Sequence, residues 1–164
     1  MLTPHRLLAT TLLLALAAVT PNLAASPHPS PAFACQNGPA SGTWDLPNSS
    51  GGTGLMTGKL IDGTTHLTDY LIKASLTATS SPCLSCIQGN INGALYTPSG
   101  ASTIYVVKGT YSGSFFTGSG TFAANIFSII GPSTQPVGKI TGTFSDPPGS
   151  TTPGTFKGNW EICP

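Results

Sequence analysis

The sequence predicts an all-β protein, an antiparallel up-and-down barrel of about eight glycine-rich strands. Three observations lead to this fold class. A seven-residue pattern, Gly-x-apolar-x-Gly-x-apolar, occurs five times. Apolar and polar residues alternate with the period of two that strands have, and clusters of Gly, Pro, Ser, Asn and Asp separate the alternating segments. A two-sheet sandwich has the same alternation and is the alternative.

The repeated pattern places its glycines on the same face of each strand as its apolar residues. The copies are GLMTGKL (54–60), GNINGAL (89–95), GTYSGSF (109–115), GKITGTF (138–144) and GTFKGNW (154–160). Positions one, three, five and seven point to one face, and mostly polar residues point to the other. Glycines on an inner face allow strong coiling of the strands, which bends a sheet until it closes. An outer-membrane barrel would instead carry its apolar face outside.

The first four predicted strands follow this alternation. In SGTWDL (41–46), Trp44 and Leu46 face inward and Asp45 faces outward, and PNSSGG ends the strand. The copy at 54–60 ends at the turn DGTT. HLTDYLIKASL (66–76) places four apolar side chains inward: Tyr70, Ile72, Ala74 and Leu76. The copy at 89–95 lies between the turn signals SSPCLSC and TPSGA.

The last four predicted strands show the same alternation, with glycine and apolar residues facing inward and mostly polar residues facing outward. ASTIYVVKGTYSGSF (101–115) has an inward set of Tyr105, Val107, Gly109, Tyr111, Gly113 and Phe115. GSGTFAANI (118–126) follows a glycine-rich turn and points Gly118, Gly120, Phe122, Ala124 and Ile126 inward. The copies at 138–144 and 154–160 are separated by DPPGSTTPG, a strong turn signal. No Asp, Glu or Lys of these strands falls on the inner face.

The N-terminus has the layout of a secretory signal peptide. Arg6 precedes an uncharged apolar run, residues 7–19, and small residues follow. The run is too short to span a bilayer as a helix. We therefore predict a signal peptide over residues 1–25, with cleavage as late as residue 34. A membrane anchor and a lipid attached to Cys35 are the minor alternatives.

The predicted domain organisation has one folded unit. A proline-rich segment, residues 26–40, leads from the signal peptide into a β-barrel domain at residues 41–164. We expect a secreted, periplasmic or extracellular protein without stable membrane insertion. Charged residues are only 7% of the chain, with a formal net charge of +1. Nucleic acid is not an expected partner, because binding phosphates requires a basic patch.

The chain has four cysteines, which in an exported protein predict two disulfides. With an even number of antiparallel strands, the start of the first strand and the end of the last lie at the same end of the barrel. Cys35 should therefore pair with Cys163, and Cys83 with Cys86 at the opposite end. A redox pair or a zinc site at CLSC lacks the helix or the further ligands that it needs. We expect no metal site and no cofactor.

No catalytic residues are predicted, and we expect a protein that is not an enzyme. His66 stands beside the DGTT turn. It is an odd number of positions from Asp69, so on a strand the two side chains would point to opposite faces and should not meet. Asp62 and Asp146 lie in turns, where aspartate bonds to its own backbone. Glycoside cleavage would need two acids facing one cleft, and the strand acids point outward.

The inner face offers the candidate binding residues. Aromatic side chains with polar tips are typical of small-ligand sites, and five of them are candidates: Trp44, Tyr70, Tyr105, Tyr111 and Trp160. The alternative is a solid core, since small barrels can be filled by side chains. The protein would then be a structural or interaction module of the cell envelope or extracellular space.

The stretch Gly42-Thr43-Trp44 on the first predicted strand resembles the Gly-x-Trp of calycin-type barrels, the lipocalins and avidins. The resemblance covers these three residues and implies a barrel that binds a small ligand in its interior. The further tryptophans that line an avidin pocket have no clear match here. We carry over only Gly42 and Trp44 and expect a small apolar ligand as the partner.

Overall fold

The computed structural model describes residues 34–47, 53–80, 84–130 and 134–163, which form eight strands and no helix. The strands are β1 (Gln36–Asp45), β2 (Thr53–Ile61), β3 (Thr68–Ala78), β4 (Cys86–Tyr96), β5 (Thr103–Ser114), β6 (Ser119–Ser128), β7 (Gly138–Ser145) and β8 (Gly154–Ile162). No helix in this part of the chain is long and apolar enough to cross a membrane.

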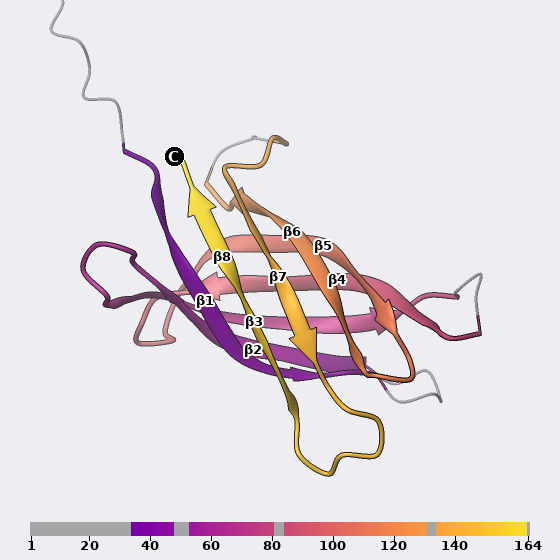
Figure 1. Ribbon diagram of the computed structural model, residues 1–164. Coiled ribbons are helices and arrows are strands. Elements are labelled where there is room, and N and C mark those ends of the chain that lie inside the picture. The colour runs from indigo at the N-terminus through magenta and orange to yellow at the C-terminus, as the bar shows by residue number, and fades with distance from the viewer. Residues whose placement is uncertain (1–33, 48–52, 81–83, 131–133, 164) are drawn as a thin grey trace, which may run out of the picture. The chain divides into compact units, whose positions relative to one another are not determined.

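The eight strands form one closed antiparallel barrel in which each strand pairs with the next (Figure 1). β8 closes the barrel by pairing with β1 from Gln36↔Ile162 to Trp44↔Gly154. The predicted barrel is confirmed, and the sandwich alternative is wrong, because this pairing leaves no free strand edge. We call the end where β1, β3, β5 and β7 finish the mouth, and the opposite end the disulfide end.

The first strand begins earlier than predicted. β1 starts at Gln36, so residues 36–40, which the sequence assigned to the proline-rich segment, belong to the barrel. Pro39 is accommodated because β1 pairs there with β8 alone, and pairing with β2 begins at Ala40. A proline, which lacks an N–H donor, is tolerated where a strand has an unpaired side. The predicted signal peptide, residues 1–25, lies outside the described residues.

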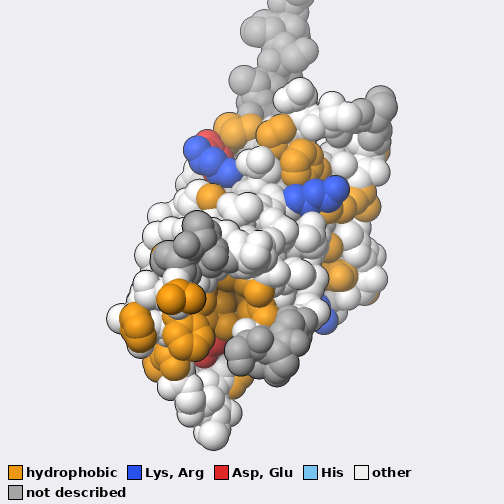
Figure 2. All heavy atoms as spheres, turned by 90° about the vertical axis from the view of Figure 1, so that its right-hand side faces the viewer, with side chains coloured by type: hydrophobic (Ala, Val, Ile, Leu, Met, Phe, Trp, Pro, Cys, Tyr) orange, Lys and Arg blue, Asp and Glu red, His pale blue; other side chains and the backbone are white. Residues whose placement is uncertain are grey.

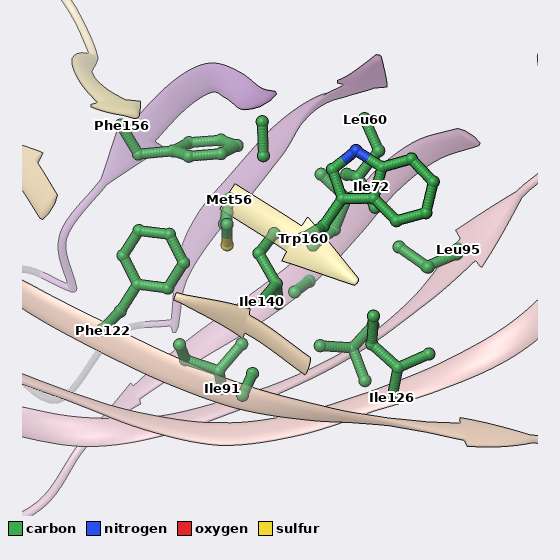
Figure 3. Close-up of a cluster of buried hydrophobic side chains, with 14 of the residues drawn as sticks. Met56, Leu60, Ile72, Ile91, Leu95, Phe122, Ile126, Ile140, Phe156 and Trp160 are labelled. Atoms are coloured by element: carbon green, nitrogen blue, oxygen red, sulfur yellow. The ribbon is translucent and has the colours of Figure 1, made fainter. Parts of the chain in front are cut away.

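Apart from Phe115, the predicted inner face is confirmed along the eight strands. Its apolar side chains form one buried cluster, and none of the buried side chains in the described ranges is polar or charged. Figure 3 shows members of this cluster from several strands pointing into one volume. The fully buried members with the largest side chains are Trp44, Trp160, Phe156, Met56, Leu60, Ile72, Leu76, Ile91, Leu95, Ile126, Ile140 and Ile162.

One residue predicted to face inward does not. β5 ends at Ser114, and Phe115 is 51% exposed at the mouth. The ladder with β4 continues, since the Phe115 N–H donates to the Ser85 carbonyl at 2.7 Å. The last inward pair is Gly113↔Gly120, so Phe115 lies beyond the final layer of core side chains.

The glycines of the repeated pattern lie beside the large aromatic rings. In the pairing register, Gly42 faces Phe156, Gly120 faces Phe144 and Phe122 faces Gly142. A Cβ atom on Gly42 would lie 2.7 Å from Cε1 of Phe156, closer than real Cβ atoms approach. The absent side chains therefore leave room for rings from the neighbouring strands, in addition to allowing the curvature that closes the barrel.

The predicted disulfide between Cys35 and Cys163 is confirmed. Their Cα atoms are 4.3 Å apart across a sequence separation of 128 residues. The bridge lies beside the pair Gln36↔Ile162, where β1 begins and β8 ends. Cys86 is also disulfide-bonded and begins β4 at the mouth, the opposite end, as predicted. Its predicted partner, Cys83, lies outside the described residues.

Candidate ligand pocket at the barrel mouth

The barrel separates the five candidate binding residues into two groups. Trp44 and Tyr111 lie in the half of the barrel nearer the mouth, because β1 and β5 finish there. Tyr70, Tyr105 and Trp160 lie toward the disulfide end, near the start of β3 and β5 and the end of β8. The five residues therefore do not line one common cavity.

The mouth half of the interior is filled by rings. The ring of Trp44 stacks on Phe144 with centroids 4.5 Å apart and planes at 6°, and it meets Tyr111 edge-on at 5.6 Å. Phe122 and Phe156 complete the layer at 5.4 and 6.4 Å from Trp44. Trp44 is fully buried, and its Nε1 has no hydrogen-bond partner among the residues that the structure describes. A desolvated, unpaired donor lowers stability, and here it is surrounded by aromatic neighbours.

In the half of the barrel nearer the disulfide end, the polar groups of the aromatic side chains make hydrogen bonds within the protein. The Tyr70 hydroxyl donates to Oε1 of Gln36 at 2.9 Å, and Nε1 of Trp160 donates to the Ile61 carbonyl at 3.0 Å. Tyr70 meets both Trp160 and Tyr105 edge-on, at 5.5 and 5.7 Å. Burial, and then the neighbouring Tyr105, raise the pKa of Tyr70 to about 12. These groups act as internal structural contacts.

A pocket of about 750 Å³ opens at the mouth. Its described lining comes from the ends of β1, β3, β4 and β5 and from the connections that follow β5 and β7. The lining residues are Asp45, Leu46, Pro47, Ala78, Thr79, Ser80, Cys86, Ile87, Gln88, Tyr111, Phe115, Gly118 and the connection 146–153. Figure 2 shows a hollow on this side of the molecule with hydrophobic side chains gathered around it. The sequence predicted a site in the interior, whereas the pocket lies above the interior layer of rings.

Tyr111 is the candidate residue that contributes to this pocket. It is only 3% exposed, and a Cβ on the facing Gly89 would lie 2.5 Å from its hydroxyl oxygen. The hydroxyl therefore lies over Gly89, next to the lining residues Ile87 and Gln88, and it makes no hydrogen bond to any described residue. Burial raises the pKa of Tyr111, so the hydroxyl keeps its proton at neutral pH.

The wall of the pocket formed by the β7–β8 connection is fixed to β1. The Leu46 N–H donates to Oδ2 of Asp146 at 2.7 Å, which joins β1 to β7 across the start of β8. The Asp146 N–H donates to the Gly118 carbonyl at 2.7 Å and so joins the connection after β5 to the same wall. These bonds hold three connections in one arrangement around the opening.

Sequence reasoning missed most of this pocket. Leu46, Ile87, Phe115 and Asp146 line it, and none of them was a candidate binding residue. The signal that could have found it is the length of DPPGSTTPG, residues 146–154, which is longer than a tight hairpin turn requires. A long connection at one end of a barrel can build a wall over that end.

Of the titratable groups considered for catalysis, Asp45 and Asp146 line the mouth pocket, whereas His66 and Asp62 lie at the disulfide end. His66 is in the connection between β2 and β3 at the disulfide end, with a left-handed φ of 59°. In the same turn, the carboxylate of Asp62 accepts the N–H groups of Thr65 and Thr64, and these bonds, the one from Thr65 most, lower the pKa of Asp62. Cys35, Glu161 and Cys163 also cluster, but the two sulfurs are joined in a disulfide and so offer no thiolate to a metal.

No protein-family model matches this chain, and no curated protein or solved structure does.

Proposed function

We propose that this chain is an exported, non-catalytic barrel protein that binds a small apolar ligand in the pocket at its mouth. The observation that carries the proposal is the pocket itself, with its volume of about 750 Å³ and a lining in which prolines, Leu46, Ile87, Tyr111 and Phe115 lie among polar residues. Ligand sites are concave, mostly apolar and about 300–1,000 Å³ in volume, with a few polar groups that orient the ligand. Here Tyr111 and Phe115 offer ring surfaces, and Gln88 and Thr79 lie among the polar lining residues.

Export is supported by two independent features. The N-terminal residues have the order of a signal peptide. The second feature is the disulfide between Cys35 and Cys163, because disulfides form and persist in oxidising compartments. N-terminal sequencing of the mature protein tests this part of the proposal, because export predicts a start between residues 26 and 35. A chain that keeps Met1 in its native compartment would contradict it.

The resemblance to calycin-type barrels agrees with a binding function, but the proposed ligand site lies at the mouth of the barrel and not in its interior. Gly42 and Trp44 lie on the first strand of an eight-stranded barrel. In this chain, however, the Trp44 ring is packed among Phe144, Tyr111 and Phe122, and the ligand would rest above that layer.

A titration with N-phenyl-1-naphthylamine, an apolar dye that fluoresces on leaving water, tests the binding function. We expect one saturable site in the native protein. Phe115→Ala should weaken binding by about tenfold, because it removes a ring from the wall and one decade corresponds to ~1.4 kcal/mol. Phe116→Ala is the matched control, since Phe116 is 77% exposed and does not line the pocket. Absence of saturable binding, or equal losses in both variants, would contradict the proposal.

The second candidate function is a structural or interaction module of the cell envelope or extracellular space. The filled interior favours it, because a solid core needs no ligand to be stable. The outer face also carries a continuous row of hydroxyl residues across six strands, in which neighbours are register partners: Thr57, Thr43, Thr155, Ser145, Ser119 and Ser114. This function is the one that would remain if the dye found no site.

A further inference from the structure

We infer that the ligand of the mouth pocket carries a positively charged nitrogen on its apolar body. This inference rests on the proposed binding function and names the ligand class of the same site. It follows from three observations. The charged residues that line the pocket are both acidic, their carboxylates have no cationic partner among the described residues, and the hydroxyl of Tyr111 makes no hydrogen bond to a described residue.

The charges at the mouth are all negative. Asp45 and Asp146 line the pocket, and the described lining contains no Lys, Arg or His. The two mouth connections that contain undescribed residues, 48–52 and 81–83, have no charged residue in their sequence. The field at the opening is therefore that of two carboxylates with no cation on the surrounding connections to balance them, and such a field attracts cations.

Neither carboxylate is paired with a cation in the described part of the chain. Oδ2 of Asp146 accepts the Leu46 N–H at 2.7 Å, which holds the group in one orientation, and its other oxygen accepts no hydrogen bond from a described residue. Asp45 is exposed, and its carboxylate makes no ion pair or hydrogen bond in the described part of the chain. By contrast, Glu161 at the disulfide end is paired with Lys139 at 3.6 Å.

The apolar part of the pocket suits the same ligand. Tyr111 and Phe115 line the pocket, and Phe115, which is 51% exposed, has accessible ring surface that can attract a cation as well as an apolar group. Tyr111 is 3% exposed, and its hydroxyl, which has no partner among the described residues, can accept a hydrogen bond from an ammonium N–H. A molecule with an apolar body and a cationic nitrogen would use the rings, the hydroxyl and the carboxylates together. A neutral apolar molecule would use the rings alone.

Two dansyl amides with arms of the same shape test the inference. One arm ends in a primary ammonium and the other in an uncharged methyl group. At low ionic strength we expect the cationic probe to bind about tenfold more tightly, which corresponds to ~1.4 kcal/mol. This advantage should shrink in about 1 M salt, where the Debye length is only ~3 Å.

Charge-neutral variants locate the effect. Asp146→Asn keeps an oxygen for the Leu46 N–H, and Asp45→Asn changes an exposed side chain, so both variants should fold. Each should reduce the ratio of cationic-probe affinity to neutral-probe affinity by about threefold, or ~0.7 kcal/mol. Asp69→Asn, the same change near the disulfide end, is the control and should have no effect.

The outcomes separate this inference from the function on which it rests. If both probes bind equally, or if the cationic advantage survives in the Asp45→Asn/Asp146→Asn double variant, the inference is overturned and the binding function stands. If neither probe binds, both are overturned. If the advantage is lost on removing the carboxylates and retained in Asp69→Asn, the inference is supported.

Discussion

Phe122 of β6 lies directly over Gly142 of β7. The two residues are register partners, and a Cβ placed on Gly142 would come within 2.8 Å of Cε1 of Phe122 and 2.7 Å of the Gly158 Cα atom. The same relationship joins Gly120 to Phe144, where the corresponding distance to the ring is 2.8 Å. The inner glycines and the inner rings are therefore parts of one packing arrangement.

Substitution of Gly142 should expose this arrangement. Gly142→Val should lower the free energy of unfolding by about 1–3 kcal/mol, because the new side chain would overlap a buried ring and the backbone of β8. Thr141→Val, on the exposed face of the same strand, should change it by less than about 0.5 kcal/mol. Denaturant melts measure both values. Equal effects, or the reverse order, would contradict the assignment of faces.

Tyr111→Trp tests whether the interior is full. Tyr111 is 3% exposed and packs edge-on against Trp44 and Phe144, at 5.6 and 6.0 Å. We expect the larger ring to lower the free energy of unfolding by ~1 to 3 kcal/mol, as overpacking does. Thermal and urea melts give the value. A variant as stable as the parent would mean that the layer beneath the pocket has spare volume.

The two tyrosine hydroxyls should differ in their contribution to stability. Tyr70→Phe removes the 2.9 Å bond to Gln36 and should cost about 1 kcal/mol. Tyr111→Phe removes a hydroxyl that has no partner among the described residues, so it should cost less than about 0.5 kcal/mol. Urea melts compare the two. A larger loss at Tyr111 than at Tyr70 would show that the Tyr111 hydroxyl has a structural role.

Stability should fall at alkaline pH through Tyr70. Its pKa is about 12 in the folded protein against an ordinary value of 10.0. The unfolded chain therefore releases this proton first, and the stabilisation that is complete below pH 10 is lost as the pH rises from 10 toward 12. The melting temperature measured across this range should fall less steeply in Tyr70→Phe. Identical slopes would mean that other groups govern the alkaline transition.

Loss of the Cys35–Cys163 bridge should destabilise the barrel strongly. The bridge closes a loop with a sequence separation of 128 residues, and removing such a bond typically costs ~2–5 kcal/mol. The double variant Cys35→Ser/Cys163→Ser should show this loss in denaturant melts. An unchanged midpoint would indicate that the β1–β8 pairing alone is enough to keep the two ends of the barrel domain together.

The sequence by itself determined nearly all of the residues that face inward, Phe115 excepted, and it favoured a closed sheet over a two-sheet sandwich. Period-two alternation depends only on strand geometry, so Ile140 and Phe144 could be assigned to the core from their spacing alone. An even number of antiparallel strands places Cys35 beside Cys163 without any knowledge of side-chain packing. Both inferences rest on local periodicity and chain topology, which the sequence expresses directly.

Only the tertiary structure decided whether the barrel is hollow and where a ligand could bind. Whether Trp44 lines a cavity or fills one depends on the combined volume of rings from four other strands, and the stacking on Phe144 at 4.5 Å shows that it fills one. One wall of the pocket is fixed by a hydrogen bond between Leu46 and Asp146, which are 100 positions apart in the sequence. Such contacts depend on loop conformation and volume, neither of which has a period that can be read from the chain.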